Sequence, residues 1–181
     1  PALDDVARVA EGTGAKLLAE TFPARLERGA GRPVVERLSY LGDFAAVQLA
    51  GLRHLVLVDA ASPVTFFAYP DKPSDLVPEG CEVTVLASGS EDVAGALAAL
   101  ATAVDAPAEP PRQVPARPAR PTGALTADTA AQAIGALLPE HAIVSDEANT
   151  SGLFAPTHTA GAPPHDWLTL TGGAIGQAIP L

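Results

Sequence analysis

The first 104 residues alternate between apolar positions at helical spacing and short continuous apolar runs. Helical spacing occurs in three segments, residues 3–13, 35–50 and 90–104, and Ser90 is the expected N-cap of the third. Continuous runs, which are typical of buried parallel strands, occur in AKLLAET (15–21), HLVLVDA (54–60) and CEVTVLAS (81–88). Such an order of helices and strands predicts an α/β domain with a doubly wound parallel sheet over residues 1–104. The stretch between 21 and 35 contains two glycines and two prolines, so we expect a loop there.

Regular spacing stops at residues 105–123, DAPAEPPRQVPARPARPTG, which contain six prolines. Proline at this density favours extended, semi-rigid backbone and cannot build a core. We therefore predict a Pro-rich linker between two domains.

A second α/β pattern follows over residues 124–181. Residues 125–139 have helical spacing, with Thr126 as the expected N-cap. A strand then runs into the polar turn SDEANTSG (145–152). A second strand, WLTLT, in which we expect Trp167 to pack in the core, runs into the glycine turn GGAIG (172–176). About sixty residues are few for a domain of this type, so we expect this second domain to be truncated.

The amino-acid composition disfavours several classes of binding partner. Net charge is −10, which disfavours binding to nucleic acid or to an anionic membrane surface. The longest apolar stretch is too short to span a membrane. With one cysteine, Cys81, the chain can form no internal disulfide, and a signal peptide is not evident. These features predict a cytoplasmic protein.

Two turns carry the candidate chemistry, and we expect them to follow adjacent strands and to face the same side of one sheet. The glycines at 172, 173 and 176 give GGxxG, which fits neither the GxGxxG of a dinucleotide site nor a P-loop, so a Rossmann-like nucleotide binder is disfavoured. The turn can bring backbone close to a ligand, or it can be a tight structural turn. Likewise, Asn149, Thr150 and Ser151 suit phosphate oxygens, although SDEANTSG can also be an ordinary polar turn. Asp146 and Glu147 would oppose an anion unless a metal or a hydrogen bond offsets their charge.

These segments carry a resemblance to a known family. HAIVSDEANTSG and HDWLTLTGGAIGQAIP resemble the opening of the diphosphate-binding domain of thiamine diphosphate-dependent enzymes, in the acetolactate synthase large-subunit-like branch related to benzoylformate decarboxylase. Four earlier segments resemble the central domain of that family: ETFPARLERGAG, ERLSYLG, HLVLVDAASPVTFFAYP and PSDLVPEGCEV. The resemblance implies a central domain followed by the start of the diphosphate-binding domain.

The resemblance also implies roles for residues of both turns. Asn149 and Thr150 match positions that hold the cofactor diphosphate. Gly173 matches the residue whose carbonyl accepts a hydrogen bond from the cofactor's aminopyrimidine, and Ile175 matches the apolar residue that enforces its bent conformation. Gly172 and Ala174 then need to be small.

The implied activity is thiamine diphosphate- and magnesium-dependent decarboxylation of a small 2-oxo acid, followed by protonation or carboligation (transferase chemistry). The fragment would be inactive alone, because the catalytic glutamate and the magnesium ligands belong to segments outside it. No residue of this chain is expected to bind metal. We expect no FAD, because no glycine-rich phosphate loop follows residues 54–60. A homodimer or homotetramer is implied. The alternative is a non-catalytic homologue that serves as a binding or assembly module.

Overall fold

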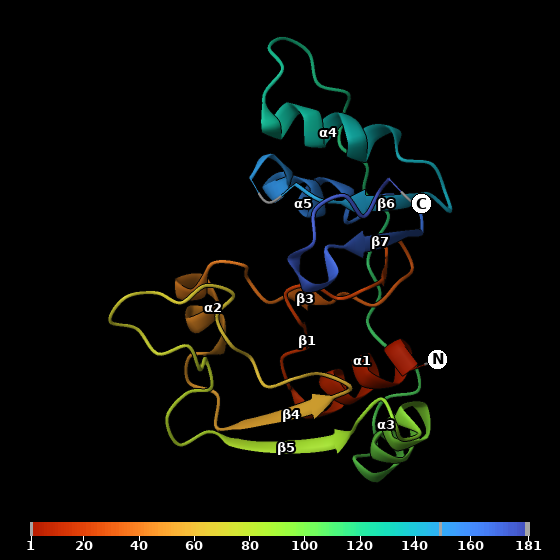
Figure 1. Ribbon diagram of the computed structural model, residues 1–181. Coiled ribbons are helices and arrows are strands. Elements are labelled where there is room, and N and C mark those ends of the chain that lie inside the picture. Colours follow the sequence, from red (N-terminus) through yellow and green to blue (C-terminus); the bar gives the residue numbers. More distant parts are fainter. Residues whose placement is uncertain (1, 149, 180–181) are drawn as a thin grey trace. The chain divides into compact units, whose positions relative to one another are not determined.

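The chain folds into two compact units in the computed structural model, which describes residues 2–148 and 150–179 (Figure 1). Unit 1 comprises Pro1–Thr21 and Val35–Pro110, and unit 2 comprises Phe22–Val34 and Pro111–Leu181. The division after Pro110 falls inside the predicted Pro-rich segment, whereas the exchange of residues 22–34 between units was not predicted.

Unit 1 combines helices with two small parallel sheets. Its elements are α1 (Ala2–Thr13), β1 (Leu18–Ala19), β3 (Glu36–Arg37), α2 (Gly42–Leu49), β4 (His54–Val58), β5 (Glu82–Ala87) and α3 (Val93–Ala103). β1 pairs with β3 and β4 pairs with β5, both in parallel (Figure 1). α1 packs against α3. The parallel pairing of the two clearest predicted strands, 54–60 and 81–88, is thus confirmed.

The predicted helix over residues 35–50 is only half right. Its first part is strand β3, because the backbone continues beside β1 and Leu38 donates its N–H to the carbonyl of Ala19 at 2.9 Å. The helix begins at Gly42, and its inward face builds a small core. That core joins Leu38, Ala45 and Leu49 with the partly buried Leu18, Leu52 and Leu76.

Two helix N-termini test the capping predictions. Thr126 caps α4 as predicted, because its hydroxyl accepts the N–H of Thr129 while the Thr129 side chain bonds back to the Thr126 backbone. For α3 the prediction of Ser90 is wrong. Asp92 is the N-cap, with its carboxylate accepting the N–H of Gly95 at 2.9 Å.

Unit 2 is built on a three-stranded sheet. Its elements are β2 (Leu26–Arg28), α4 (Ala127–Leu137), β6 (Ile143–Asp146), the 3₁₀ turn η1 (Ser151–Phe154), α5 (Ala155–Thr159), β7 (His165–Thr169) and the 3₁₀ turn η2 (Thr171–Gly173). The strand order is β2-β7-β6, with β6 parallel and β2 antiparallel to β7. α5 packs against α4. Helices with small parallel sheets in unit 1 and a mixed sheet in unit 2 are consistent with the α/β class.

The prediction of a loop over residues 22–34 is wrong, because β2 lies within it. Arg25 fixes this strand on β7 through a bidentate ion pair with Asp166, with nitrogen–oxygen distances of 2.9 and 3.1 Å. Gly29 follows at φ 106°, where a Cβ atom would lie 2.6 Å from the carbonyl oxygen of Pro163. The strand is short and its partner is about 140 residues away, so local periodicity could not indicate it.

Part of the Pro-rich segment is bonded to unit 2. Ala116 forms an isolated bridge with Gly161, and the guanidinium of Arg117 donates to the carbonyls of Ala136 and Leu138 at 2.9 Å each. Those carbonyls belong to the last turn of α4, which leaves acceptors without helical partners. Arg117 therefore acts as a C-terminal cap supplied from outside the helix. Within the described residues, every helix is too short or too polar to cross a membrane.

Candidate functional site

Both predicted turns follow neighbouring parallel strands. β6 and β7 pair in register from Ile143 opposite Asp166 to Asp146 opposite Thr169. Parallel strands place their carboxyl ends at one edge of the sheet, so the polar turn after β6 and the glycine turn after β7 share that edge. The predicted adjacency of the two turns is confirmed. In open α/β sheets this edge is where ligands bind.

The glycine turn has backbone geometry that requires glycine. Gly172, Gly173 and Gly176 have φ angles of 65°, 71° and 101°. Residues with a Cβ atom rarely adopt such φ angles, so the backbone conformation of the turn favours glycine at each of these positions. The turn closes through the N–H of Gly173, which donates to the carbonyl of Leu170 at 3.0 Å. Leu170 is itself buried, so the turn is anchored at the end of β7.

The tip of this turn presents both an apolar side chain and a backbone acceptor. Ile175 is 82% exposed, and the neighbouring Gly172 and Ala174 are also exposed. Gly173 is half-buried, and in the described part of the chain no group donates a hydrogen bond to its carbonyl. The arrangement can accept one hydrogen bond from a ligand and place an aliphatic surface against it.

The polar turn supplies hydroxyl groups at the same edge. Thr150 is exposed and directly precedes η1, and its carbonyl accepts the N–H of Leu153 at 3.3 Å. Gly152 lies so close to Ala148 that an added Cβ would be 2.8 Å from the Ala148 side chain, which keeps the turn tight. Asn149, the other predicted diphosphate residue, lies outside the described residues.

Hydrogen bonds engage both carboxylates that precede this turn. Asp146 accepts the indole N–H of Trp167 and the N–H of Ala148, each at 3.1 Å. Glu147 accepts the backbone N–H of Gly176 at 2.6 Å and that of Ala178 at 2.7 Å. The bonds from Ala178 and Gly176 hold the pKa of Glu147 below its usual range.

The negative charges of Asp146 and Glu147 are thus offset by hydrogen bonds from β7 and from the glycine turn. The specific partners of Glu147 could not be predicted, because they lie 29 and 31 residues further along the chain. Ser145 adds a third link to the same segment, since its hydroxyl accepts from the Gln177 amide at 3.2 Å. The end of β6 is therefore bonded at several points to the residues that follow Ile175.

Two histidines that precede the glycine turn lie in regular secondary structure. His158 lies on α5, and its Nε2 is 2.8 Å from the carboxylate of Asp128 in the first turn of α4. His165 lies on β7 and is 4% exposed, with Nδ1 bonded to the carbonyl of Pro163 at 2.8 Å. Burial lowers the pKa of His165, and the nearby Arg28 guanidinium adds to that effect. Trp167 is 3% exposed, which confirms its predicted role in strand packing.

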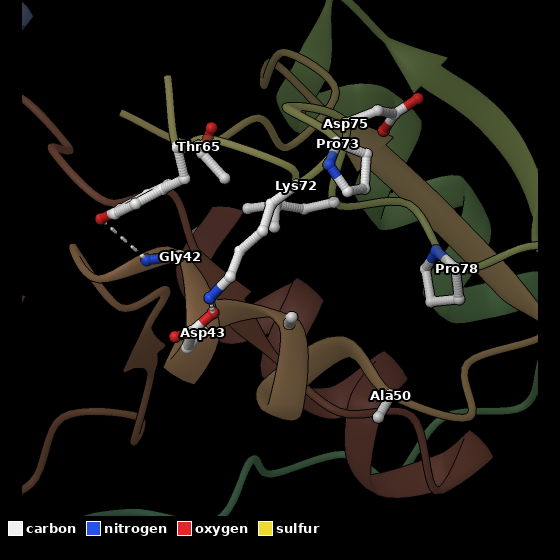
Figure 2. A pocket seen from close by; sticks show the side chains of 11 residues that line it. Gly42, Asp43, Ala50, Thr65, Lys72, Pro73, Asp75 and Pro78 are labelled. Carbon is white, nitrogen blue, oxygen red and sulfur yellow. Dashed lines mark hydrogen bonds and ion pairs between the residues drawn. The ribbon is translucent and has the colours of Figure 1, made fainter. Parts of the chain in front are cut away.

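Unit 1 contains a separate cavity of about 240 Å³ beside α2. Figure 2 shows the Lys72 side chain reaching Asp43 at the start of that helix, where the two form an ion pair at 2.5 Å. The Tyr69 hydroxyl lies 3.5 Å from the N–H of Gly42. The cavity is smaller than the roughly 300–1,000 Å³ typical of ligand pockets, and its one ammonium group is already paired.

No cluster of three or more His, Cys, Asp or Glu side chains that could hold a metal ion occurs among residues 2–148 and 150–179. Within those residues, the chemistry of the candidate site thus rests on backbone groups, hydroxyls and the aliphatic side chain of Ile175.

Comparison with known proteins gives one informative relative. The chain is 59% identical, over 180 residues, to a Mycobacterium tuberculosis (strain ATCC 25618 / H37Rv) protein named "Putative acetolactate synthase large subunit IlvX". The alignment covers 99% of this chain and 35% of the relative, so the chain spans about a third of that protein. No family model and no solved structure matches the chain. The similarity supports the acetolactate synthase-like branch of the resemblance.

Proposed function

We propose that the whole protein is a thiamine diphosphate- and magnesium-dependent enzyme of the acetolactate synthase type, which decarboxylates a small 2-oxo acid and forms a new carbon–carbon bond or protonates the product. The observation that carries this proposal is the glycine turn after β7, set beside the polar turn after β6 at one sheet edge. The similarity to a protein named as an acetolactate synthase subunit gives independent support.

The residues at this edge fit the cofactor in chemistry. The carbonyl of Gly173 is an acceptor without a donor among the described residues, which suits an amino group. Ile175 presents an exposed aliphatic side chain, which suits contact with the cofactor rings. Thr150 offers a hydroxyl that suits a phosphate oxygen. We assign Asn149 to the diphosphate together with Thr150.

Thiamine diphosphate supplies the electron sink that makes loss of carbon dioxide from a 2-oxo acid feasible. The residues of this chain would bind and orient the cofactor. Gly173 would hold the aminopyrimidine side of the cofactor through its carbonyl, and Ile175 would contact the cofactor rings and favour the bent conformation. Gly172 and Ala174 would leave room for the cofactor, because neither residue carries a bulky side chain. Thr150 holds the diphosphate end.

The rest of the proposal concerns the whole protein. Its magnesium ligands and its catalytic glutamate belong to segments outside this chain, so the fragment is inactive alone. Apart from residues 22–34, which belong to unit 2, residues 1–104 are assigned to a central domain with the doubly wound topology. Residues 105–123 link it to the next domain, and the central domain binds no FAD. The active enzyme is a cytoplasmic homodimer or homotetramer.

Activity of the full-length protein tests the proposal. Release of carbon dioxide is measured with pyruvate and a panel of longer 2-oxo acids, in the presence of thiamine diphosphate and magnesium chloride. We expect turnover with at least one of these acids, and loss of turnover when a chelator removes the magnesium. If the cofactor binds but no 2-oxo acid is decarboxylated, the protein is the non-catalytic binding or assembly homologue instead.

A further inference from the structure

The carboxylate of Glu147 joins the two turns of the candidate site. It leaves the end of β6 and accepts hydrogen bonds from two backbone N–H groups beyond the glycine turn, Gly176 at 2.6 Å and Ala178 at 2.7 Å. Hydrogen bonds to an ionised acceptor are shorter and stronger than neutral ones. The residue is half-buried, although the neighbouring Ala148 is exposed.

The position of these two N–H groups matters for Ile175. Gly176 directly follows Ile175, and its φ of 101° lies in a region that only glycine adopts readily. A backbone with three glycines among five residues has many alternative conformations, so it needs an external contact to keep one of them. Glu147 provides that contact on the far side of Ile175, while the bond from Gly173 to Leu170 provides one on the near side.

We propose that Glu147 is a positioning residue, whose carboxylate fixes the backbone after the glycine turn and thereby sets the place of Ile175 and of the Gly173 carbonyl. The cofactor role of those two groups rests on the proposed function. Glu147 itself touches neither substrate nor cofactor in this account. It acts through the peptide groups of residues 176 and 178.

The same contact defines where an anion can bind at this edge. Backbone N–H groups at a glycine turn commonly receive a phosphate. Here the N–H groups of Gly176 and Ala178 already receive a carboxylate, so a diphosphate is directed to the polar turn and Thr150 instead. The glycine turn is left to contact the uncharged part of a ligand.

Hydrogen exchange in the full-length protein, measured by mass spectrometry without added cofactor, tests this role. The variants are Glu147→Ala, which removes both bonds, and Glu147→Gln, which keeps one uncharged oxygen acceptor. Glu91→Gln is the matched control. The Glu91 carboxylate also accepts a backbone N–H, that of Ser88 at 2.8 Å, but it lies in unit 1 outside the glycine turn.

We expect exchange in the peptide spanning residues 170–179 to rise about fivefold or more in Glu147→Ala and less in Glu147→Gln. Other peptides and the thermal midpoint should change little, and Glu91→Gln should leave the turn peptide unchanged. In a decarboxylation assay of Glu147→Ala, kcat should fall by a larger factor than the factor by which the KM for thiamine diphosphate rises.

Unchanged exchange of the turn peptide in Glu147→Ala would overturn the inference, and so would an equal rise in all peptides, which indicates general destabilisation. This readout does not depend on the cofactor. A wild-type protein that binds no thiamine diphosphate would overturn the proposed function, while the exchange data would still decide whether Glu147 holds the turn.

Discussion

Trp167 donates its indole N–H to the carboxylate of Asp146 at 3.1 Å, across the parallel strands that carry the candidate site. Trp167 stands in the middle of β7 and is 3% exposed, whereas Asp146 is the last residue of β6. The bond engages one carboxylate oxygen with β7, while the other oxygen accepts the N–H of Ala148 within the polar turn. It also ties the start of the polar turn to the core of unit 2.

Replacing Trp167 by phenylalanine removes this bond while keeping an aromatic ring in the core. We expect the free energy of unfolding to fall by about 1–3 kcal/mol, because the half-buried carboxylate loses a donor and the smaller ring leaves space. Urea denaturation followed by circular dichroism measures the change. Asp146→Asn, which keeps an oxygen acceptor for the indole, should cost less than Trp167→Phe. The reverse order would show that the bond contributes little.

Ile175→Ala tests the role of the exposed aliphatic side chain at the turn. Removing a group that holds the cofactor conformation, but anchors neither end of it, should lower kcat about tenfold or more. The affinity for thiamine diphosphate should change less than kcat. The control is Ile179→Ala, because Ile179 lies four residues away and is 89% exposed. Equal turnover in the Ile175 variant and the wild type would remove Ile175 from its assigned role.

The buried His165 predicts a pH dependence of stability. Its pKa is lowered from the ordinary 6.5, first by burial and then by the charge of Arg28, although the Pro163 carbonyl and Asp166 act in the opposite direction. The unfolded chain therefore binds a proton at higher pH than the folded protein does. The stability linked to His165 is fully present above about pH 6.5 and is lost as the pH falls toward the lower folded pKa.

Urea denaturation of the full-length protein at pH 7.5, 6.5 and 5.5 measures this dependence. We expect a smaller loss of stability between pH 7.5 and 5.5 in His165→Gln than in the wild type. His141→Asn is the control, since His141 is exposed and its φ of 61° is one that asparagine tolerates. A wild-type slope in His165→Gln would mean that other groups cause the pH dependence.

Local patterns predicted the elements whose stability is local. The apolar runs that became β4 and β5, and the Thr126 cap of α4, were evident because their signals lie within a few residues. β2 was missed because its pairing with β7 depends on contacts distant in sequence. The start of the helix predicted over 35–50 was wrong for the same reason, because residues 36–37 form β3 by pairing with β1.

The features of the candidate site also divide into those that local sequence predicted and those that depend on distant contacts. Its two turns and their shared sheet edge followed from strand order, because carboxyl ends of parallel strands meet at one edge. The charges of Asp146 and Glu147 were recognised as needing partners, but the partners themselves come from Trp167 and from the residues after Ile175. The assignments of Thr150, Gly173 and Ile175 to a cofactor remain predictions.

Calorimetric titration of the full-length protein with thiamine diphosphate tests the central claim most directly. In the presence of magnesium we predict saturable binding with one site per chain, and a large loss of affinity when a chelator replaces the magnesium. Binding should persist in Ile179→Ala, which lies beside the turn but has no assigned contact. Absence of binding at high cofactor concentration with magnesium present would contradict the account.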